Sequence, residues 1–300
     1  MPKPPEETSP SPATEPQHRI GITLMLMSTV AFAVMAVCAK MASEHVGSAF
    51  TILSRSAVVL AILLPFMRLR GVPLLGRGNL YLHMRCFFGA LSMHLYYYAL
   101  KGAPLAECVV LANTAPLFIP LVSYYIVGEI PRFGLIAIIA IGFVGIAILV
   151  GPPLEQFRVH LLAAAGTGFS GAIALTSLQR ASSHDDPSTI VFTFALWTLA
   201  LSLPFSWTVT LEAIQSAWIP LLGLGLLSVP AQLLLTAAMR RSSAGILGVF
   251  NYFGVVLNFA LGMYFFNEIP GSWTYVGAFF VITACLLVSR FAPKLIRYRR

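Results

Sequence analysis

The sequence predicts an all-α integral membrane protein in which ten transmembrane helices form an inverted 5+5 repeat. Three observations predict it: the composition, the number of long apolar stretches, and short motifs that recur at a constant offset. Hydrophobic residues make up 58% of the 300 residues and charged residues only 10%. Soluble domains contain about 25% charged residues, so lipid is the expected solvent for most of the chain.

A helix that crosses the hydrocarbon core needs about 20 mostly apolar residues. Ten stretches meet this requirement, five in each half of the chain. They are 20–41, 49–68, 79–100, 104–127 and 131–151, followed by 159–180, 188–208, 214–239, 242–266 and 271–291. Several of the short links contain Pro or Gly, which stop helices because Pro lacks a backbone donor and Gly tolerates turns.

The two ends of the chain are polar. Residues 1–18 are rich in Pro, Glu, Ser and Thr, which predicts a disordered cytoplasmic tail. No apolar core with a small-residue cleavage site follows this tail, so the first apolar segment is expected to stay as a span. Residues 292–300 form a basic tail that should lie against anionic headgroups. Between the tails, the two five-helix units occupy residues 19–151 and 159–291.

A shift of 139 residues lays the second half of the chain over the first. It superimposes Glu129-Ile130-Pro131 on Glu268-Ile269-Pro270 and, without a gap, Leu64-Pro65-Phe66 on Leu203-Pro204-Phe205. Separate motifs at one offset indicate two copies of one unit. Because each unit has an odd number of spans, the second enters the membrane from the opposite side. Inverted repeats of this kind let a transporter expose one central site alternately to each side.

The Lys and Arg residues between the spans predict the orientation. If the N-terminus is cytoplasmic, most of them fall in cytoplasmic links, and the opposite links hold Lys101 and Arg158. The positive-inside rule then places both termini in the cytoplasm. Equivalent residues of the two units lie at opposite faces, with Glu129 near the cytoplasmic surface and Glu268 near the external one.

Several function classes are disfavoured by what the sequence lacks. The four cysteines lie singly in apolar runs, without the paired spacing of a metal or redox site, so no metal or cofactor is expected. There is no phosphate-binding Gly-rich loop for direct use of ATP. The links are too short for a catalytic cap, which argues against a membrane enzyme. The net charge of +8 is spread between spans rather than gathered for nucleic acid. A channel and a receptor or assembly subunit stay open.

The order and spacing of short motifs resemble the EamA-type family of the drug/metabolite transporter (DMT) superfamily, over about residues 20–291. The motifs are Arg55, Ala99-Leu100, Pro104-Leu105-Ala106, Thr114-Ala115-Pro116-Leu117, and the glutamates that end the fourth span of each repeat. The resemblance implies a bacterial inner-membrane carrier with a cavity between spans one, three, four, six, eight and nine. Phe194 stands where the second repeat would match Arg55, so the two halves cannot make equivalent polar contacts.

The expected function is a secondary transporter that moves small metabolites, chiefly exporting amino acids or amino-acid derivatives, by alternating access. The alternatives are an importer of a cofactor-like metabolite, an exporter of a metal-chelating amino-acid derivative, and a multidrug efflux carrier. The direction of transport cannot be read from the residues. The expected partners are a small-molecule substrate and the lipid bilayer, with protons as a candidate coupling ion. Both a monomer and a homodimer are open.

Polar side chains inside spans are costly, so they usually face a cavity or a partner. The substrate-binding candidates, all on spans that line the implied cavity, are Arg85, His94, Tyr97, Asn113, Gln232, Asn251, Tyr252 and Asn258. Arg85 can bind a carboxylate through its forked guanidinium or reach the headgroups as an anchor. His94 can couple protons or make a structural hydrogen bond. The amides can instead bridge helices.

Four charged residues are gating or structural candidates. Arg55 and Glu107 lie in the outer parts of their spans, which predicts an ion pair between them; alternatively, each reaches the interface alone. Glu129 and Glu268 end helices beside prolines, where an acid opposes the helix dipole. We expect them to make gating or locking contacts with the opposite half, with a solvated loop charge as the alternative.

Overall fold

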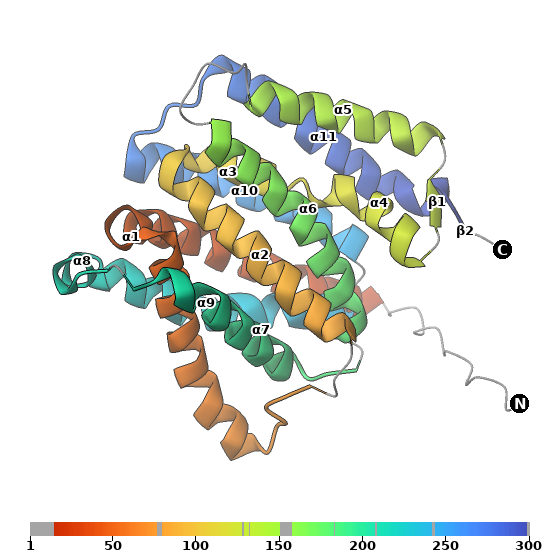
Figure 1. The fold of residues 1–300 in the computed structure, drawn as a ribbon. Coiled ribbons are helices and arrows are strands. Elements are labelled where there is room, and N and C mark those ends of the chain that lie inside the picture. The colour runs from red at the N-terminus through yellow and green to blue at the C-terminus, as the bar shows by residue number, and fades with distance from the viewer. Residues whose placement is uncertain are drawn as a thin grey trace, which may run out of the picture.

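The computed structural model describes residues 15–76, 80–127, 129–131, 133–150, 158–182, 184–207, 209–241 and 244–298. Within these ranges the chain is a bundle of long helices with one small pair of strands (Figure 1). Five of the described helices are long and apolar enough to cross a membrane by length and composition. The protein is an all-helical membrane protein with ten spans in two repeats, as predicted.

The first repeat begins with α1 (Glu15–Arg70), which contains two spans. They meet at Gly47, whose φ of 74° and ψ of 161° are outside the helical region. Glycine adopts a positive φ at little steric cost, so the chain can turn back there. The remaining elements of this repeat are α2 (Leu80–Gly102), α3 (Leu105–Ala112), α4 (Ala115–Val127) and α5 (Phe133–Val150).

The second repeat follows the same order. Its elements are α6 (Arg158–Ala181), α7 (Pro187–Ser202), the 3₁₀ turn η1 (Leu203–Phe205), α8 (Leu211–Ser216), α9 (Trp218–Arg241), α10 (Ala244–Phe266) and α11 (Ser272–Leu295). The start of α7 is well specified by the sequence. Asp186 accepts a hydrogen bond from the backbone N–H of Ser188 at 2.8 Å, and Pro187 occupies the first turn.

Two short strands, which the sequence analysis did not predict, define one end of the bundle. β1 (Glu129–Pro131) pairs antiparallel with β2 (Ile296–Tyr298), so the ends of α4 and α11 meet. Because successive spans alternate in direction, α1 also begins at this end, which we call the basal end. The opposite end, with Gly47 and the link between α2 and α3, is called the distal end (Figure 1).

The expected single span 104–127 is broken. Asn113 has φ −82° and ψ 13°, and α4 begins two residues later. Pro116 has no N–H to donate to the carbonyl of Ala112, so the helical ladder cannot continue through this point. Thr114 compensates in part, since its hydroxyl donates to the carbonyl of Leu111 at 2.6 Å. The break therefore comes from proline chemistry and removes Asn113 from a regular helix.

The expected span 214–239 is also divided. Residues Leu211–Ser216 form the separate short helix α8, and the span itself, α9, begins at Trp218. Ala217 between them has φ −109° and ψ 8°. Pro220 cannot donate to the carbonyl of Ser216, which explains why the two helices do not merge.

The helix packing follows the predicted repeat. α1 packs most extensively against α9, α2 against α6, and α5 against α11. α2 and α9 are the third spans of the two repeats, while α6 and the first part of α1 are the first spans. In each contact the third span of one repeat packs against the first span of the other, so the two contacts are equivalent. Such exchanged pairs are what a two-fold axis between two repeats produces.

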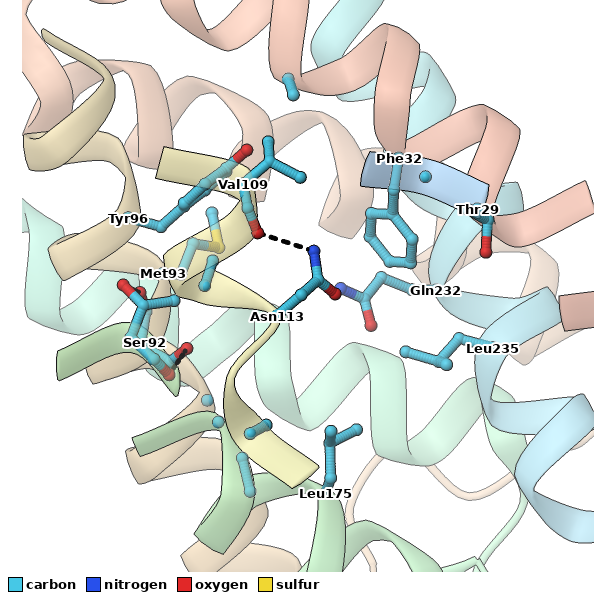
Figure 2. Close-up of a pocket in the computed structure, with 18 of the residues that line it drawn as sticks. Thr29, Phe32, Ser92, Met93, Tyr96, Val109, Asn113, Leu175, Gln232 and Leu235 are labelled. Atoms are coloured by element: carbon cyan, nitrogen blue, oxygen red, sulfur yellow. Dashed lines mark hydrogen bonds between the residues drawn. The ribbon is translucent and has the colours of Figure 1, made fainter. Parts of the chain in front are cut away.

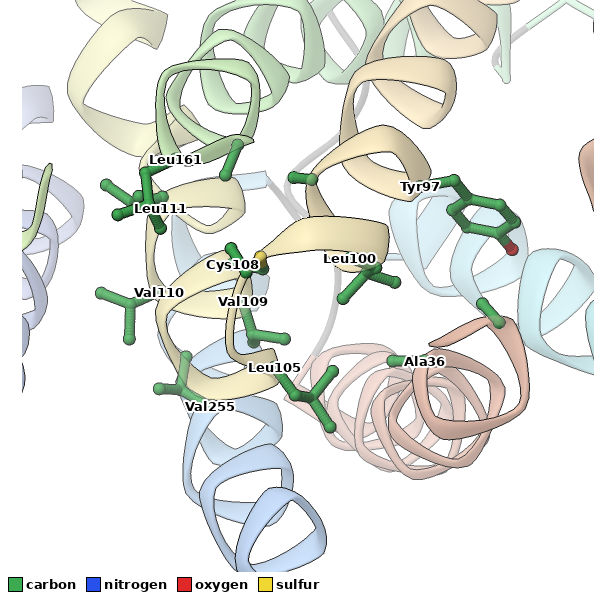
Figure 3. Close-up of a cluster of buried hydrophobic side chains, with 14 of the residues drawn as sticks. Ala36, Tyr97, Leu100, Leu105, Cys108, Val109, Val110, Leu111, Leu161 and Val255 are labelled. Carbon is green, nitrogen blue, oxygen red and sulfur yellow. The ribbon is translucent and has the colours of Figure 1, made fainter. Parts of the chain in front are cut away.

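The largest hydrophobic cluster lies toward the distal end. It joins residues of α1, α2, α3, α6 and α10, among them Ala36, Leu100, Leu105, Leu161 and Val255 (Figure 3). Leu100 and Leu105 are at most 1% exposed. These side chains fill the described part of the bundle beside the α2–α3 link.

The α5–α11 contact depends on Gly145. A Cβ at this position would lie 2.8 Å from the backbone nitrogen of Val281 and 2.8 Å from Phe280 Cβ. Backbone atoms cannot move aside cheaply, so Gly145→Ala should cost about 1–3 kcal/mol by overpacking. Thermal unfolding of the purified protein in detergent measures the effect. Gly223→Ala is the matched control, because its nearest neighbour, Cys38 Sγ, is at an ordinary 3.4 Å. Equal melting temperatures for the two variants would contradict the packing.

Candidate functional site

A cavity of about 310 Å³ lies in the middle of the bundle. Its walls come from α1, α2, α3, α4, α6, α9 and α10. These elements are the six spans that the family resemblance implies, and they are joined by Arg55 of the second span and Phe194 of α7. Both repeats therefore contribute side chains to one site.

The break between α3 and α4 supplies a polar wall of this cavity. Asn113 Nδ2 donates to the carbonyl of Val109 at 2.8 Å (Figure 2). Gln232 of α9 and Asn258 of α10 reach the same cavity from the other repeat. Non-helical backbone is tolerated at membrane depth where it lines a cavity, which explains why the broken span can persist here.

Two arginines line the cavity among the described residues, and both are buried. Arg55 is 2% and Arg85 6% exposed. Arg55 donates from Nε to Ser228 Oγ at 2.6 Å, and its Nη1 lies 3.1 Å from Met93 Sδ. Arg85 donates from Nη2 to Gln232 Oε1 at 3.4 Å. None of the described side chains that line the cavity is acidic, so its wall carries net positive charge.

Phe194 contacts both guanidinium groups. The centre of its ring lies 5.9 Å from Arg55 Cζ and 4.6 Å from Arg85 Cζ. The negative face of an aromatic ring attracts a cation, so this ring stabilises both charges where no carboxylate does. Because Phe194 is the repeat counterpart of Arg55, one position supplies a cation in the first half and an aromatic ring in the second.

Two buried polar atoms at this cavity have no hydrogen-bond partner within the described structure. They are Arg85 Nε, a donor, and Asn258 Oδ1, an acceptor. Asn258 uses its other atom, Nδ2, to donate to the carbonyl of Gly254 at 2.7 Å. Buried polar groups are nearly always paired, so unpaired atoms in a cavity point to a further partner there.

The structure brings five of the predicted binding residues to this cavity: Arg85, Tyr97, Asn113, Gln232 and Asn258. Their part in substrate binding stays a prediction. The side chains of Asn251, Tyr252 and Glu129 lie outside the described part of the structure.

His94 does not line the cavity. Its Nδ1 lies 2.8 Å from the carbonyl oxygen of Ala90, and its Nε2 lies 2.9 Å from Ser202 Oγ of α7. Both ring nitrogens therefore have partners, one within α2 and one on α7. This is the structural alternative left open for His94, and a substrate contact in the present conformation is not formed.

The predicted ion pair between Arg55 and Glu107 is not formed in the described structure. Arg55 turns toward α9 and the cavity, whereas Glu107 accepts a hydrogen bond from Thr274 Oγ1 of α11 at 2.7 Å. Both residues were assigned to the outer parts of their spans, and span depth alone does not define the direction of a side chain. Arg55 belongs to the cavity, and Glu107 belongs to the distal end.

A part-buried ion pair lies at the distal end. Lys40 Nζ of α1 pairs with Glu268 Oε1 and also donates to the carbonyl of Ala103 at 3.0 Å. Glu268 Oε2 accepts from the backbone N–H of Leu105 at 2.7 Å. The Lys40 and Glu268 side chains are 9% and 18% exposed. We call Lys40, Ala103, Leu105 and Glu268 the distal latch.

The latch joins the two repeats. Lys40, Ala103 and Leu105 belong to the first repeat and Glu268 to the second, so the expected contact of Glu268 with the opposite half is present. Lys40 lies in the expected span 20–41, and no partner was predicted for it. The sequence does hold a signal for the pair, because both charges are expected at the external end of their spans.

Other lining residues were not singled out from the sequence. Apart from Phe194, they include Thr29, Phe32, Ser92, Met93 and Tyr96 (Figure 2). They are apolar, or hydroxyl-bearing residues that occur throughout membrane helices. Their composition carries no signal that separates a cavity wall from an ordinary helix contact.

Comparisons with known proteins agree with this architecture. The model of the EamA-like transporter family matches residues 19–151 and 159–290. The pseudopaline exporter CntI of Pseudomonas aeruginosa is 30% identical over 276 residues, which cover 90% of this chain and 96% of that protein. A riboflavin transporter of Vibrio cholerae is 26% identical over 292 residues, which cover 93% and 96%.

A solved crystal structure matches the fold with a TM-score of 0.61 and 23% sequence identity, covering 91% of this chain and 98% of that one. The family match falls on the two repeats separately and extends over almost all ten spans. A duplicated bundle, a cavity shared by both copies and two family matches converge on one assignment. The chain belongs to the EamA-like transporter family of the DMT superfamily, and it is a multi-pass membrane transporter of a small-molecule substrate rather than an enzyme.

Proposed function

We propose that this protein exports a small carboxylate-bearing amino-acid derivative, of the metal-chelating kind, across the bacterial inner membrane. The Pseudomonas relative is named as an exporter of such a compound, pseudopaline. This supports the metal-chelating alternative better than export of common amino acids. The Vibrio relative, a riboflavin transporter, supports import of a cofactor-like metabolite through a lower identity of 26%.

One observation carries the proposal: a cavity between the repeats holds two buried arginines and no acidic side chain among its described lining residues. Each buried cation in a membrane protein costs about 2.5–3.5 kcal/mol on insertion scales. Charges retained at that cost usually serve binding or ion movement. An anionic substrate would neutralise them, which a neutral flavin ring would not do.

Alternating access needs a site that each end can close in turn. The distal latch and the hydrophobic cluster beside it join elements of both repeats, which supports a cavity closed on the distal side. The positive-inside rule assigns the basal end to the cytoplasm. The conformation then corresponds to a carrier shut toward the outside, the state that loads a substrate for export.

Counterflow in proteoliposomes tests the proposal. The panel contains labelled common amino acids, a metal-free chelating amino-acid derivative with several carboxylates, and riboflavin, each with and without a pH gradient. We expect saturable exchange of the chelating derivative and little exchange of riboflavin. Exchange of riboflavin alone would support the importer instead, and flux that does not saturate would indicate a channel.

The latch should control access to the cavity from the distal side. Lys40→Gln and Glu268→Gln each remove one partner of the ion pair that joins the two repeats at the distal end, so both should favour the distally open state. In a protein whose native cysteines are replaced, Ala36→Cys introduces a thiol in the cavity wall. This thiol should react several-fold faster with an impermeant reagent added outside in the latch variants than in the protein with an intact latch. Thr274→Val is the control, because it removes the Glu107 hydrogen bond at the same end and leaves the latch intact. An unchanged labelling rate in Lys40→Gln would remove the latch from the gating scheme.

His94→Gln should leave the pH dependence of exchange unchanged. The imidazole is held between Ala90 and Ser202, away from the cavity, so its titration should not follow substrate movement. Initial exchange rates across a pH series measure this, with Ser202→Ala as a control for the structural hydrogen bond. Loss of the pH dependence in His94→Gln alone would make His94 the proton-coupling group after all.

A further inference from the structure

We infer that the cavity recognises a molecule with at least two carboxylates and one amine, the carboxylates through Arg55 and Arg85 and the amine through Asn258. The inference rests on the proposed function, because it names the chemical class of the transported substrate. It depends on three features of the cavity. Two guanidinium groups keep unused donors, one of them packs against the helix at Gly89, and the amide oxygen of Asn258 is an unpaired acceptor.

The two arginines offer more donors than the protein uses. Arg55 donates from Nε to Ser228 and from Nη1 to Met93, and Arg85 donates from Nη2 to Gln232. Arg85 Nε is buried without a partner among the described residues. A guanidinium has five N–H donors in a planar fork that matches a carboxylate. Each arginine therefore keeps donors for an anionic group.

Both guanidinium groups can be reached by one small molecule. They contact the same ring, Phe194, at 5.9 and 4.6 Å from its centre. Both groups line the same cavity, so an anion bound there would offset the repulsion between two like charges. A molecule with two carboxylates would satisfy both arginines, whereas a single carboxylate would leave one cation uncompensated.

The position of Arg85 is built into the sequence at Gly89. A Cβ at Gly89 would lie 2.2 Å from Arg85 Nη1 and 3.0 Å from Phe194 Cε2. The guanidinium therefore packs against the helix at a position that has no side chain. The repeat counterpart of Gly89 is Ser228, the residue that holds Arg55. Equivalent positions in the two halves thus seat one arginine each, which argues against an accidental placement of either.

The amine is inferred from Asn258. The side chain is 4% exposed, its Nδ2 is committed to Gly254, and Oδ1 has no partner in the described structure. An unpaired amide oxygen accepts hydrogen bonds, and an ammonium or secondary amine is a strong donor. A guanidinium only donates hydrogen bonds, so neither arginine can accept one from an amine of the substrate. The donor and acceptor ends of the site therefore favour a zwitterion over a simple dicarboxylate.

The size of the cavity limits the substrate. Small-molecule sites usually measure about 300–1,000 Å³, and this one, at about 310 Å³, is at the lower end. Apolar side chains such as Phe32 and Leu235 complete the wall (Figure 2). They suit the short carbon chain that joins the charged groups.

Calorimetric titration of the full-length protein in nanodiscs tests the inference with three probes of similar size. Glutamate has two carboxylates and an amine, glutamine replaces one carboxylate by an amide, and glutarate lacks the amine. We expect glutamate to bind at least about tenfold more tightly than either of the others, the effect of one charged hydrogen-bonded contact. Equal affinities, or no binding of glutamate at its highest soluble concentration, would overturn the inference.

Single substitutions assign the two ends of the site. Arg85→Gln should abolish the preference for glutamate over glutamine. Asn258→Leu should abolish the preference for glutamate over glutarate and keep the first preference. His94→Gln is the control outside the cavity and should keep both. Melting temperatures without ligand check that each variant is folded, and Arg85→Lys, which keeps the charge but loses the fork, replaces Arg85→Gln if that variant unfolds.

The result separates this inference from the proposed function. If the probes are discriminated as expected but counterflow detects no exchange of any substrate, the site stands and the carrier function fails. If exchange of the chelating derivative is saturable and unchanged in Arg85→Gln, the carrier stands and the two-arginine site fails.

Discussion

Lipid cannot form hydrogen bonds with a peptide group, and this constraint governs where the protein departs from regular helix. At membrane depth the described chain breaks its ladder between α3 and α4, where Pro116 removes a donor and Asn113 leaves the helical region. The groups released there face a cavity and not the hydrocarbon, so they can be paired within the protein or by a bound molecule. The helix therefore breaks at the place where the cavity lies.

The same constraint explains the treatment of charge. Arg55 and Arg85 are surrounded by serine, methionine, glutamine and an aromatic ring, contacts that orient a guanidinium without cancelling its charge. Lys40 and Glu268, in contrast, neutralise each other at the distal end. The bundle thus separates two uses of buried charge. The paired charges of Lys40 and Glu268 hold helices together. The charges of Arg55 and Arg85, which no carboxylate neutralises, are available to a bound substrate.

The sequence predicted the features that depend on composition and repetition. The spans, the two repeats and the contact of Glu268 with the opposite half follow from apolar length, the 139-residue offset and an acid beside a proline. It did not predict which way a side chain points. Apolar residues surround these helices on nearly all sides, so no periodic polar face fixes their rotation, and Arg55 was assigned to Glu107 although it turns to Ser228.

Breaks inside spans were missed for a related reason. Pro116 and Pro220 lie near places where the helices divide, but Pro65 and Pro230 lie inside helices that continue. Neighbouring helices and side chains can satisfy the groups that a proline frees in a membrane, so a proline alone does not mark an end. At the break between α3 and α4 the hydroxyl of Thr114 pairs with Leu111, a local contact that composition does not reveal.

The distal latch has no equivalent ion pair at the corresponding positions of the other repeat. Its acid, Glu268, has the repeat counterpart Glu129, but Lys40 has the counterpart Gln179, and an amide cannot form the same ion pair. Equivalent contacts at the two ends would therefore differ in energy, which favours an unloaded carrier with the distal seal made. Gradients still set the direction of net flux. The bias determines which compartment an idle carrier samples, and so from which side a scarce solute is captured more efficiently.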